Sequence, residues 1–161
     1  MKSEIIFKEE SSCRGRYGDM NTTVITIGAS FENPAEWPFT LKSVRTKRTG
    51  WDREEEVLNS ESHKLSKDLY GKIKDVILNS ADELDSCETE LENGSMDGCV
   101  EAFTFTVDGL DKFIHGDEIL SSGSYEAEKY APDMRGDSYV VYSVVEKIKN
   151  LLAGAGIEIY F

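Results

Sequence analysis

The chain has 161 residues, of which 39% are hydrophobic, and it carries a formal net charge of -13. This hydrophobic content is well above that of disordered chains, so we expect a folded protein despite the charge. The length suits one domain and no linker or repeat interrupts it, so residues 1–161 are predicted to form a single domain. No stretch approaches the roughly 18 consecutive apolar residues of a membrane span, which excludes a membrane helix.

The three cysteines, Cys13, Cys87 and Cys99, are an odd number at irregular spacing. Disulfide frameworks of exported domains normally use an even number of cysteines, so this pattern predicts free thiols in a reducing compartment. The N-terminal residues also lack the apolar core of a signal peptide. Together these observations predict a cytoplasmic location.

Three extended segments are predicted in the N-terminal half. Ile5–Phe7 is a short apolar run, and Thr22–Phe31 is rich in Thr, Val and Ile with period-two alternation, as expected for a central strand. Phe39–Thr49 follows two prolines and carries four cationic side chains, a composition typical of an exposed sheet edge. We therefore expect two strands followed by an edge strand.

Two segments have the apolar spacing of helices. In Ser62–Leu78 the apolar residues recur every three or four positions, and Asp68 with Lys72 forms a supporting i,i+4 pair. A second helix is predicted over residues 137–154, with capping residues at its start and a glycine at its end. Between them, Ser80–Glu83 has the sequence of a capping box, which predicts a further helical turn.

The remaining segments complete the predicted fold. Cys99–Val107 alternates aromatic with small or β-branched residues, Ser121–Ser124 is loop-like, and Ile157–Phe161 alternates apolar residues up to the end of the sequence. The predicted fold is α+β: a mixed or antiparallel sheet of four to five strands with two main helices packed on one face.

The negative charge is concentrated in one segment. Asp82–Glu128 contains fourteen acidic residues and one base, Lys112, whereas acids and bases balance over the rest of the chain. Such a run is either a solvated face or a docking surface that attracts a basic partner. The acids selected as a candidate binding surface are Glu88, Glu90, Glu92, Asp97, Glu101, Asp108, Asp111, Asp117 and Glu118.

The leading functional hypothesis is an acidic protein-binding module that occupies a basic surface of a partner. The partner would be a nuclease, a toxin or another nucleic-acid-binding protein, and the module an inhibitor or immunity protein that blocks it sterically and electrostatically. No direct contact with nucleic acid or membrane is predicted, because the chain repels phosphate overall. This hypothesis requires no cofactor and no catalytic residue.

Two alternatives remain. The first is a small enzyme or ligand-binding domain with a site near His115 and Asp117, although neither residue lies in a catalytic motif or has the spacing of a calcium or zinc site. The second is a subunit of a larger assembly with Trp37, Phe39 or Trp51 as contacts. A metal site is not predicted, and an enzymatic function is not favoured.

Overall fold

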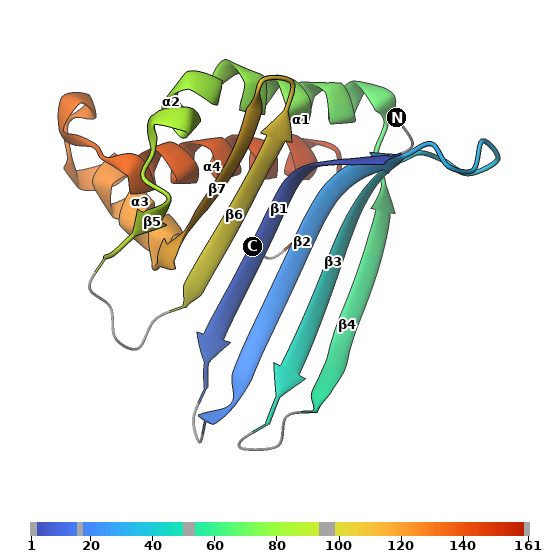
Figure 1. Cartoon of the computed structure of the whole chain (residues 1–161), viewed down its shortest axis with the longest axis horizontal. Coiled ribbons are helices and arrows are strands. Elements are labelled where there is room, and N and C mark those ends of the chain that lie inside the picture. Colours follow the sequence, from blue (N-terminus) through green and yellow to red (C-terminus); the bar gives the residue numbers. More distant parts are fainter. Residues whose placement is uncertain (1–2, 16–17, 50–53, 94–98, 160–161) are drawn as a thin grey trace.

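A mixed seven-stranded sheet organises the molecule, with the helices gathered on one side of it (Figure 1). The computed structural model describes residues 3–15, 18–49, 54–93 and 99–159. The strand order is β4-β3-β2-β1-β6-β7-β5, in which only the β5–β7 pair is parallel. The α+β class is therefore confirmed, but the seven strands and four α-helices of the described residues exceed the predicted number.

The elements have the following bounds. The strands are β1 (Ser3–Arg14), β2 (Met20–Ser30), β3 (Phe39–Arg48), β4 (Glu55–Lys64), β5 (Glu90–Leu91), β6 (Val100–Val107) and β7 (Leu110–Asp117). The helices are α1 (Lys67–Asn79), α2 (Ala81–Ser86), α3 (Ile119–Lys129) and α4 (Asp137–Gly154), with a short 3₁₀ turn, η2 (Pro132–Met134), before α4. In the described residues, no helix is both long and apolar enough to cross a membrane.

The first four strands form an antiparallel meander in chain order, and β1 joins this meander to the β6–β7 hairpin. Both predicted N-terminal strands are confirmed, although β1 extends well beyond Ile5–Phe7. The segment predicted as an edge strand is β3, but it lies inside the sheet because β4 pairs along its outer side. That part of the prediction was wrong.

Strand β4 was missed because its sequence lacks an apolar period. Nine of its ten residues are exposed, and only His63 is half-buried. A strand at the edge of a sheet can be stabilised by backbone pairing on one side without burying a row of apolar side chains, so its composition does not identify it as a strand. Because β4 was not recognised, the predicted helix began too early: Ser62, His63 and Lys64 belong to β4, and α1 begins at Lys67.

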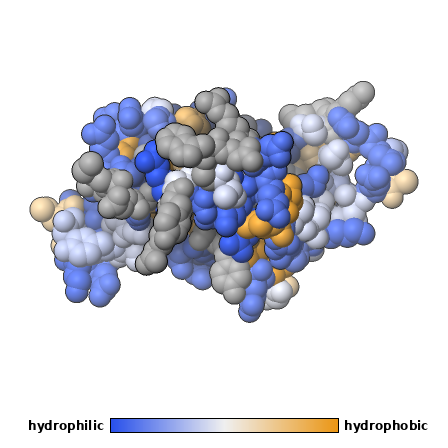
Figure 2. Space-filling view, turned by 90° about the horizontal axis from the view of Figure 1, so that it is seen from below, coloured by the Kyte–Doolittle hydropathy of each residue, from blue (hydrophilic) through white to orange (hydrophobic). Residues whose placement is uncertain are grey.

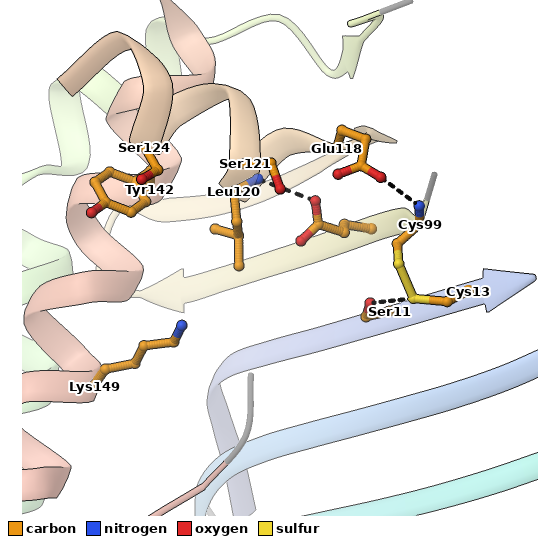
Figure 3. Close-up of a pocket in the computed structure, with 10 residues that line it drawn as sticks. Ser11, Cys13, Cys99, Glu118, Leu120, Ser121, Ser124, Tyr142 and Lys149 are labelled. Carbon is orange, nitrogen blue, oxygen red and sulfur yellow. Dashed lines mark hydrogen bonds between the residues drawn. A yellow bond between two sulfur atoms is a disulfide. The ribbon is translucent and has the colours of Figure 1, made fainter. Parts of the chain in front are cut away.

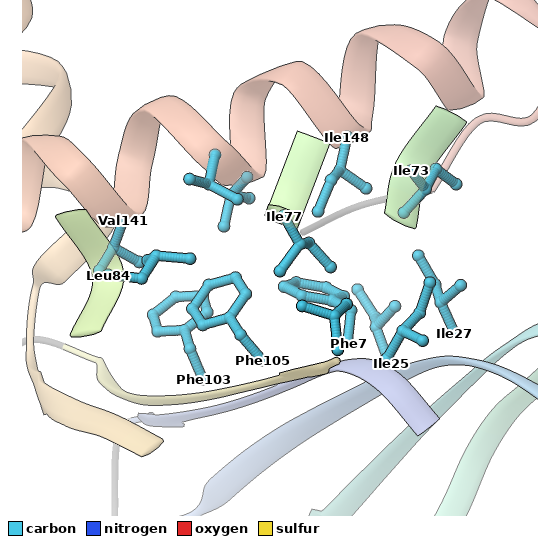
Figure 4. Packing of buried hydrophobic residues seen from close by; sticks show 14 of the residues in the cluster. Phe7, Ile25, Ile27, Ile73, Ile77, Leu84, Phe103, Phe105, Val141 and Ile148 are labelled. Carbon is cyan, nitrogen blue, oxygen red and sulfur yellow. The ribbon is translucent and has the colours of Figure 1, made fainter. Parts of the chain in front are cut away.

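The hydrophobic core lies between the sheet and the helices α1 and α4 (Figure 4). We call the helix-covered side of the sheet its inner face. Phe7, Phe103 and Phe105 project from this face and are completely buried. Burial of one such side chain contributes about 1.5–3 kcal/mol. The helical residues that cover them include Ile73, Ile77, Val141 and Ile148.

The helices confirm most of the local predictions. The Ser66 hydroxyl accepts a hydrogen bond from the Leu69 backbone N–H and caps α1, and Lys72 Nζ lies 3.1 Å from Asp68 Oδ2. Helix α2 begins after Ser80, but the Ser80 side chain makes no capping hydrogen bond, so the capping box itself does not form. Helix α4 spans the predicted residues 137–154.

The Ser121–Ser124 run lies in α3 and is not a loop. Its glycine, Gly123, is buried where α3 crosses α4. A β-carbon at Gly123 would lie 2.3 Å from the Ser138 carbonyl oxygen, so no larger residue fits without a shift. The glycine that favoured a loop in the sequence therefore permits close helix packing.

At the C-terminal end, β6 confirms the predicted strand, and Asp108 and Gly109 form the turn into β7, with Gly109 at φ 82°. Strands β7 and β5 were not predicted. The final predicted strand, Ile157–Phe161, is wrong over residues 157–159, which are not in a strand. Residues 160–161 lie outside the described part of the chain.

A disulfide joins Cys13 at the end of β1 to Cys99 just before β6, with a Cα–Cα distance of 4.2 Å. The prediction of free thiols is therefore wrong for these two residues and correct for the buried Cys87. The cause is register: Ser12 pairs with Val100, so the next residues on the two antiparallel strands face each other. Sequence spacing does not reveal that proximity.

We predict that replacing both bridged cysteines with serine lowers the free energy of unfolding by about 2–5 kcal/mol. The bridge closes a loop of 86 residues and so restricts the unfolded chain. Urea denaturation of the wild type and of the Cys13→Ser/Cys99→Ser variant measures the difference. In denaturant without reductant, alkylation should label one of the three cysteines, Cys87; labelling of all three would contradict the bridge.

Candidate functional site

A pocket lies between the inner face of the sheet and the helices α3 and α4 (Figure 3). We call it the sheet pocket; its volume is about 550 Å³, within the range of small-molecule sites. Its walls come from β1, β6 and both helices, so the tertiary fold assembles it. The lining residues are Ser11, Cys13, Cys99, Glu101, Glu118, Leu120, Ser121, Ser124, Tyr142 and Lys149.

Two carboxylates on one wall are fixed by backbone N–H groups. Glu101 on β6 is buried, and its Oε1 accepts a hydrogen bond from the Leu120 N–H at 3.1 Å, which satisfies a free donor in the first turn of α3. Glu118 Oε1 accepts from the Cys99 N–H at 2.9 Å. A hydrogen bond from a backbone N–H thus fixes the carboxylate of Glu101 and that of Glu118 at the pocket wall (Figure 3).

Glu118 has a left-handed backbone conformation, with φ 51°, at the residue that precedes α3. A non-glycine residue in this region costs on the order of 1–3 kcal/mol, and such residues concentrate at functional sites. The strained backbone turns the chain from β7 into α3 and places the Glu118 carboxylate beside the Cys13–Cys99 disulfide.

Glu9 lies in the same region but below the pocket surface. The residue is 1% exposed, and neither carboxyl oxygen has a hydrogen-bond partner among the residues that the structure describes. Burial, and then the nearby charge of Glu101, raise its pKa from 4.5 to about 8, while Lys149 opposes the shift. Both of these charged groups line the sheet pocket, Glu101 from β6 and Lys149 from α4.

The position of Glu9 follows from the alternation of β1. Phe7, Glu9 and Ser11 share the inner face, and Glu9 pairs with Ile25 on one side and Phe103 on the other. Glu9 therefore stands where the apolar core ends and the polar pocket begins. The pKa of Glu101 is also raised, mainly by burial and in part by Glu118, against the hydrogen bonds it accepts from α3.

A second pocket, of about 360 Å³, shares Glu118 and Ser121 with the first. We call it the tyrosine pocket, because Tyr125 and Tyr130 line it with their rings in an edge-to-face contact at 5.8 Å. Glu126 also lines it: one oxygen accepts from the Gly136 N–H, and the other is buried and has no partner in the described part of the chain. The two pockets thus adjoin at the first turn of α3.

The predicted acidic surface is only partly a surface. Asp97 lies outside the described residues, and Glu101 is buried in the sheet pocket. Asp117 and Glu118 are half-buried and accept hydrogen bonds from the backbone N–H groups of Asn93 and Cys99. The remaining five are exposed along the α2, β5 and β7 side of the molecule: Glu88, Glu90, Glu92, Asp108 and Asp111.

The alternative site near His115 does not coincide with a described pocket. His115 pairs with Ala102 on the face of the sheet opposite the core, and its ring stacks on Phe113 at 5.3 Å. No cysteine supplies a nucleophile near His115 either. Cys99 is in a disulfide, and burial raises the pKa of the Cys87 thiol to about 12. Asp117 lies at the turn from β7 into α3, where its carboxylate accepts the hydrogen bond from the Asn93 N–H.

The predicted aromatic contacts have structural partners within the chain. Trp37 is 48% exposed, but its indole N–H donates to the Leu65 carbonyl oxygen at 2.7 Å. Phe39 packs on Tyr70, with the ring centroids 4.7 Å apart. Trp51 lies outside the described residues.

The described side chains contain no group of three or more His, Cys, Asp or Glu residues arranged to hold a metal ion. Searches against protein-family models and against curated proteins found no match. The site is therefore interpreted from its own geometry.

Sequence reasoning missed Glu9, Lys149 and Tyr142. A signal was present for Glu9, because it lies two residues after Phe7 in a strand and therefore shares its face. Ending the first strand at Phe7 hid that relation. Lys149 and Tyr142 lie on α4 and reach the pocket through tertiary packing, for which the sequence gives no local signal.

We predict that Glu9→Gln reduces the loss of stability at rising pH. The raised pKa means that folded Glu9 keeps its proton between pH 4.5 and about 8 while the unfolded chain releases it. Wild-type stability should therefore decline across this window, by on the order of 3–5 kcal/mol from this group. Urea denaturation at pH 5 and pH 8 measures the change.

The matched control is Glu10→Gln, the exposed neighbour on the opposite face of β1. It should keep the wild-type pH dependence. If Glu9→Gln and Glu10→Gln show the same pH dependence as the wild type, the carboxyl of Glu9 is not buried as described.

Proposed function

We propose that the protein is an acidic binding module that docks on a basic surface of a protein partner. The observation that carries this proposal is the set of exposed acids along the α2, β5 and β7 side. The docking surface is defined by Glu88, Glu90, Glu92, Asp108 and Asp111, with the α2 acids Asp82, Glu83 and Asp85 beside them.

The acids of the docking surface differ in their ion pairing from those of the N-terminal half. Among the described residues, none of the five defining acids forms an ion pair, whereas acids of the N-terminal half pair with nearby lysines and arginines. Unpaired exposed carboxylates repel one another, so a basic partner that neutralises them gains electrostatic energy on binding. Electrostatic docking follows most directly from this arrangement.

Lys112, the base in the acidic segment, has another role. Its ammonium donates to the backbone carbonyl oxygens of Asp85 and Cys87, at 3.1 and 2.6 Å. It thereby satisfies acceptors at the C-terminal end of α2, in the position where a cation is favoured. The acidic side chains around it remain directed to solvent.

In this proposal the module inhibits its partner by occupation and without chemistry. The acids stand in for the phosphates of a nucleic acid on a nuclease, toxin or other nucleic-acid-binding protein, so bound module and nucleic acid exclude each other. Because the Debye length is about 8 Å at physiological salt, the attraction acts at short range and weakens as salt rises. An inhibitor or immunity protein is the biological role that fits this behaviour.

A cytoplasmic location remains a prediction. It was inferred from three free thiols, and the Cys13–Cys99 disulfide weighs against the reducing compartment on which that inference rested. The docking proposal does not depend on the compartment, because the acidic surface is separate from the disulfide.

We predict that neutralising the docking surface weakens binding of the partner. Affinity capture from the native cell at low salt should retain a basic protein and release it at high salt. The variant Glu88→Gln/Glu90→Gln/Glu92→Gln/Asp108→Asn/Asp111→Asn should bind that purified partner at least tenfold more weakly, because it loses five charges at the contact.

The control variant removes five exposed acids elsewhere, Glu10, Glu32, Glu36, Glu56 and Asp75, and has the same net charge. It should bind like the wild type. The proposal fails when no basic protein is retained at low salt, or when the two variants weaken binding equally, because the effect would then follow net charge alone.

A further inference from the structure

The Cys13–Cys99 disulfide is connected to the start of α3 through the backbone of Cys99. The Cys99 N–H donates to Glu118 Oε1 at 2.9 Å, and the Cys99 carbonyl oxygen accepts from the Glu118 N–H at 3.0 Å. The bridge holds Cys99 against the end of β1, just before β6 begins. It therefore helps to place both atoms of Cys99 that bind Glu118.

Glu118 is the residue at which the chain turns from β7 into α3. Its left-handed backbone, with φ 51°, is unfavourable for a glutamate and persists only where neighbouring contacts enforce it. The two hydrogen bonds to Cys99 are such contacts. The Glu118 carbonyl oxygen also accepts from the Ser122 N–H, so the first turn of α3 is built on this strained residue. A backbone held in one conformation by contacts can relax to another when those contacts weaken.

The bridge is placed where a reductant can reach it. Cys13 and Cys99 are both half-buried, and both line the sheet pocket (Figure 3). Cys87 differs from them, because it is buried and its Sγ donates to the Glu83 carbonyl oxygen at 3.3 Å. Of the three cysteines, the bridged pair is thus the one exposed to thiol–disulfide exchange.

Opening the bridge would act locally, because other contacts hold the surrounding elements. Strands β1 and β6 remain paired over six residue pairs, which end at Ser12 and Val100. Helix α3 still packs closely on α4 at Gly123, and Glu101 still accepts from the Leu120 N–H. The part that depends on the bridge is therefore Cys99 with the turn at Glu118.

We propose that the Cys13–Cys99 disulfide is a redox-sensitive latch, which a dithiol reductant opens and which sets the conformation of the first turn of α3. In the oxidised protein, the bridge fixes Cys99, and Cys99 holds Glu118 in its left-handed conformation. In the reduced protein, Cys99 separates from Cys13 and the Glu118 backbone relaxes. Glu118 and Ser121 line both the sheet pocket and the tyrosine pocket, so the latch changes the shape of both.

One dithiol is consumed for each bridge that opens. A thiolate of the reductant attacks one Sγ atom, forms a mixed disulfide with that cysteine and releases the other cysteine as a thiolate. The second thiolate of the reductant then displaces the first cysteine and closes the reductant's own disulfide. Two electrons pass from the dithiol to the bridge, and the two protons that the dithiol loses reach the cysteine thiolates through water.

The test is amide hydrogen exchange of the ¹⁵N-labelled full chain, followed by NMR with and without excess dithiothreitol. Alkylation with mass spectrometry verifies that the bridge is reduced. The amides of Glu118, Leu120 and Ser122 donate hydrogen bonds at the turn, and we expect them to exchange at least tenfold faster after reduction. The amides of Tyr70 and Leu84, at the starts of α1 and α2, should keep their rates.

Three variants separate the latch from a general loss of stability. Cys13→Ser/Cys99→Ser should show the fast exchange without dithiothreitol, and Cys87→Ser, the matched control, should respond like the wild type. Glu118→Gly should respond less at Leu120 and Ser122, because glycine adopts the left-handed conformation without being held there. A bridge that excess dithiothreitol leaves intact in the folded protein, equal acceleration at all five amides, unchanged exchange at the turn after reduction, or a full response in Glu118→Gly would each overturn the proposal.

Discussion

The antiparallel pairing of β1 with both β2 and β6 is the constraint on which the rest of the structure depends. It joins the N-terminal meander to the C-terminal hairpin and sets the register that opposes Cys13 and Cys99. It also orders the inner face. Along β1, Phe7 belongs to the core, Glu9 is the buried carboxyl at its boundary, and Ser11 lines the sheet pocket.

The inner face is consequently divided into an apolar part covered by α1 and α4 and a polar part beside α3. The acidic segment is divided in a related way. Some carboxylates hold the β7–α3 turn and the wall of the sheet pocket, whereas those exposed on the α2 and β5 side form no ion pair with another described residue. Seen from the end of the sheet where the β1–β2 turn lies, the coloured surface is largely hydrophilic, with a compact hydrophobic area and smaller ones nearer the edges (Figure 2). The net charge of the chain therefore includes acids that hold the fold together and acids that are exposed on the surface, and composition alone does not tell the two apart.

The sequence predicted the elements whose periodicity is set by the core. Helices α1 and α4 and strands β2 and β6 present regular apolar faces, so they were recognised with their approximate bounds. Strand β4 is exposed, β7 mixes polar and apolar residues, and α3 contains the Ser121–Ser124 run. None of these three segments therefore shows the regular spacing of apolar residues by which a strand or a helix is recognised. The disulfide and the pocket depend on strand register and helix packing, which join residues such as Ser11 and Lys149 across the whole chain.

The account rests on Glu9 as a buried carboxyl at the boundary between core and pocket, and its ionisation is directly observable. The side-chain carboxyl carbons of Glu9 and Glu10 can be followed by ¹³C NMR between pH 4 and pH 9. The structure predicts a Glu9 midpoint near pH 8, against an ordinary value of 4.5. A Glu9 midpoint near 4.5, like that of an exposed glutamate, would contradict the burial of this carboxyl and the division of the inner face that follows from it.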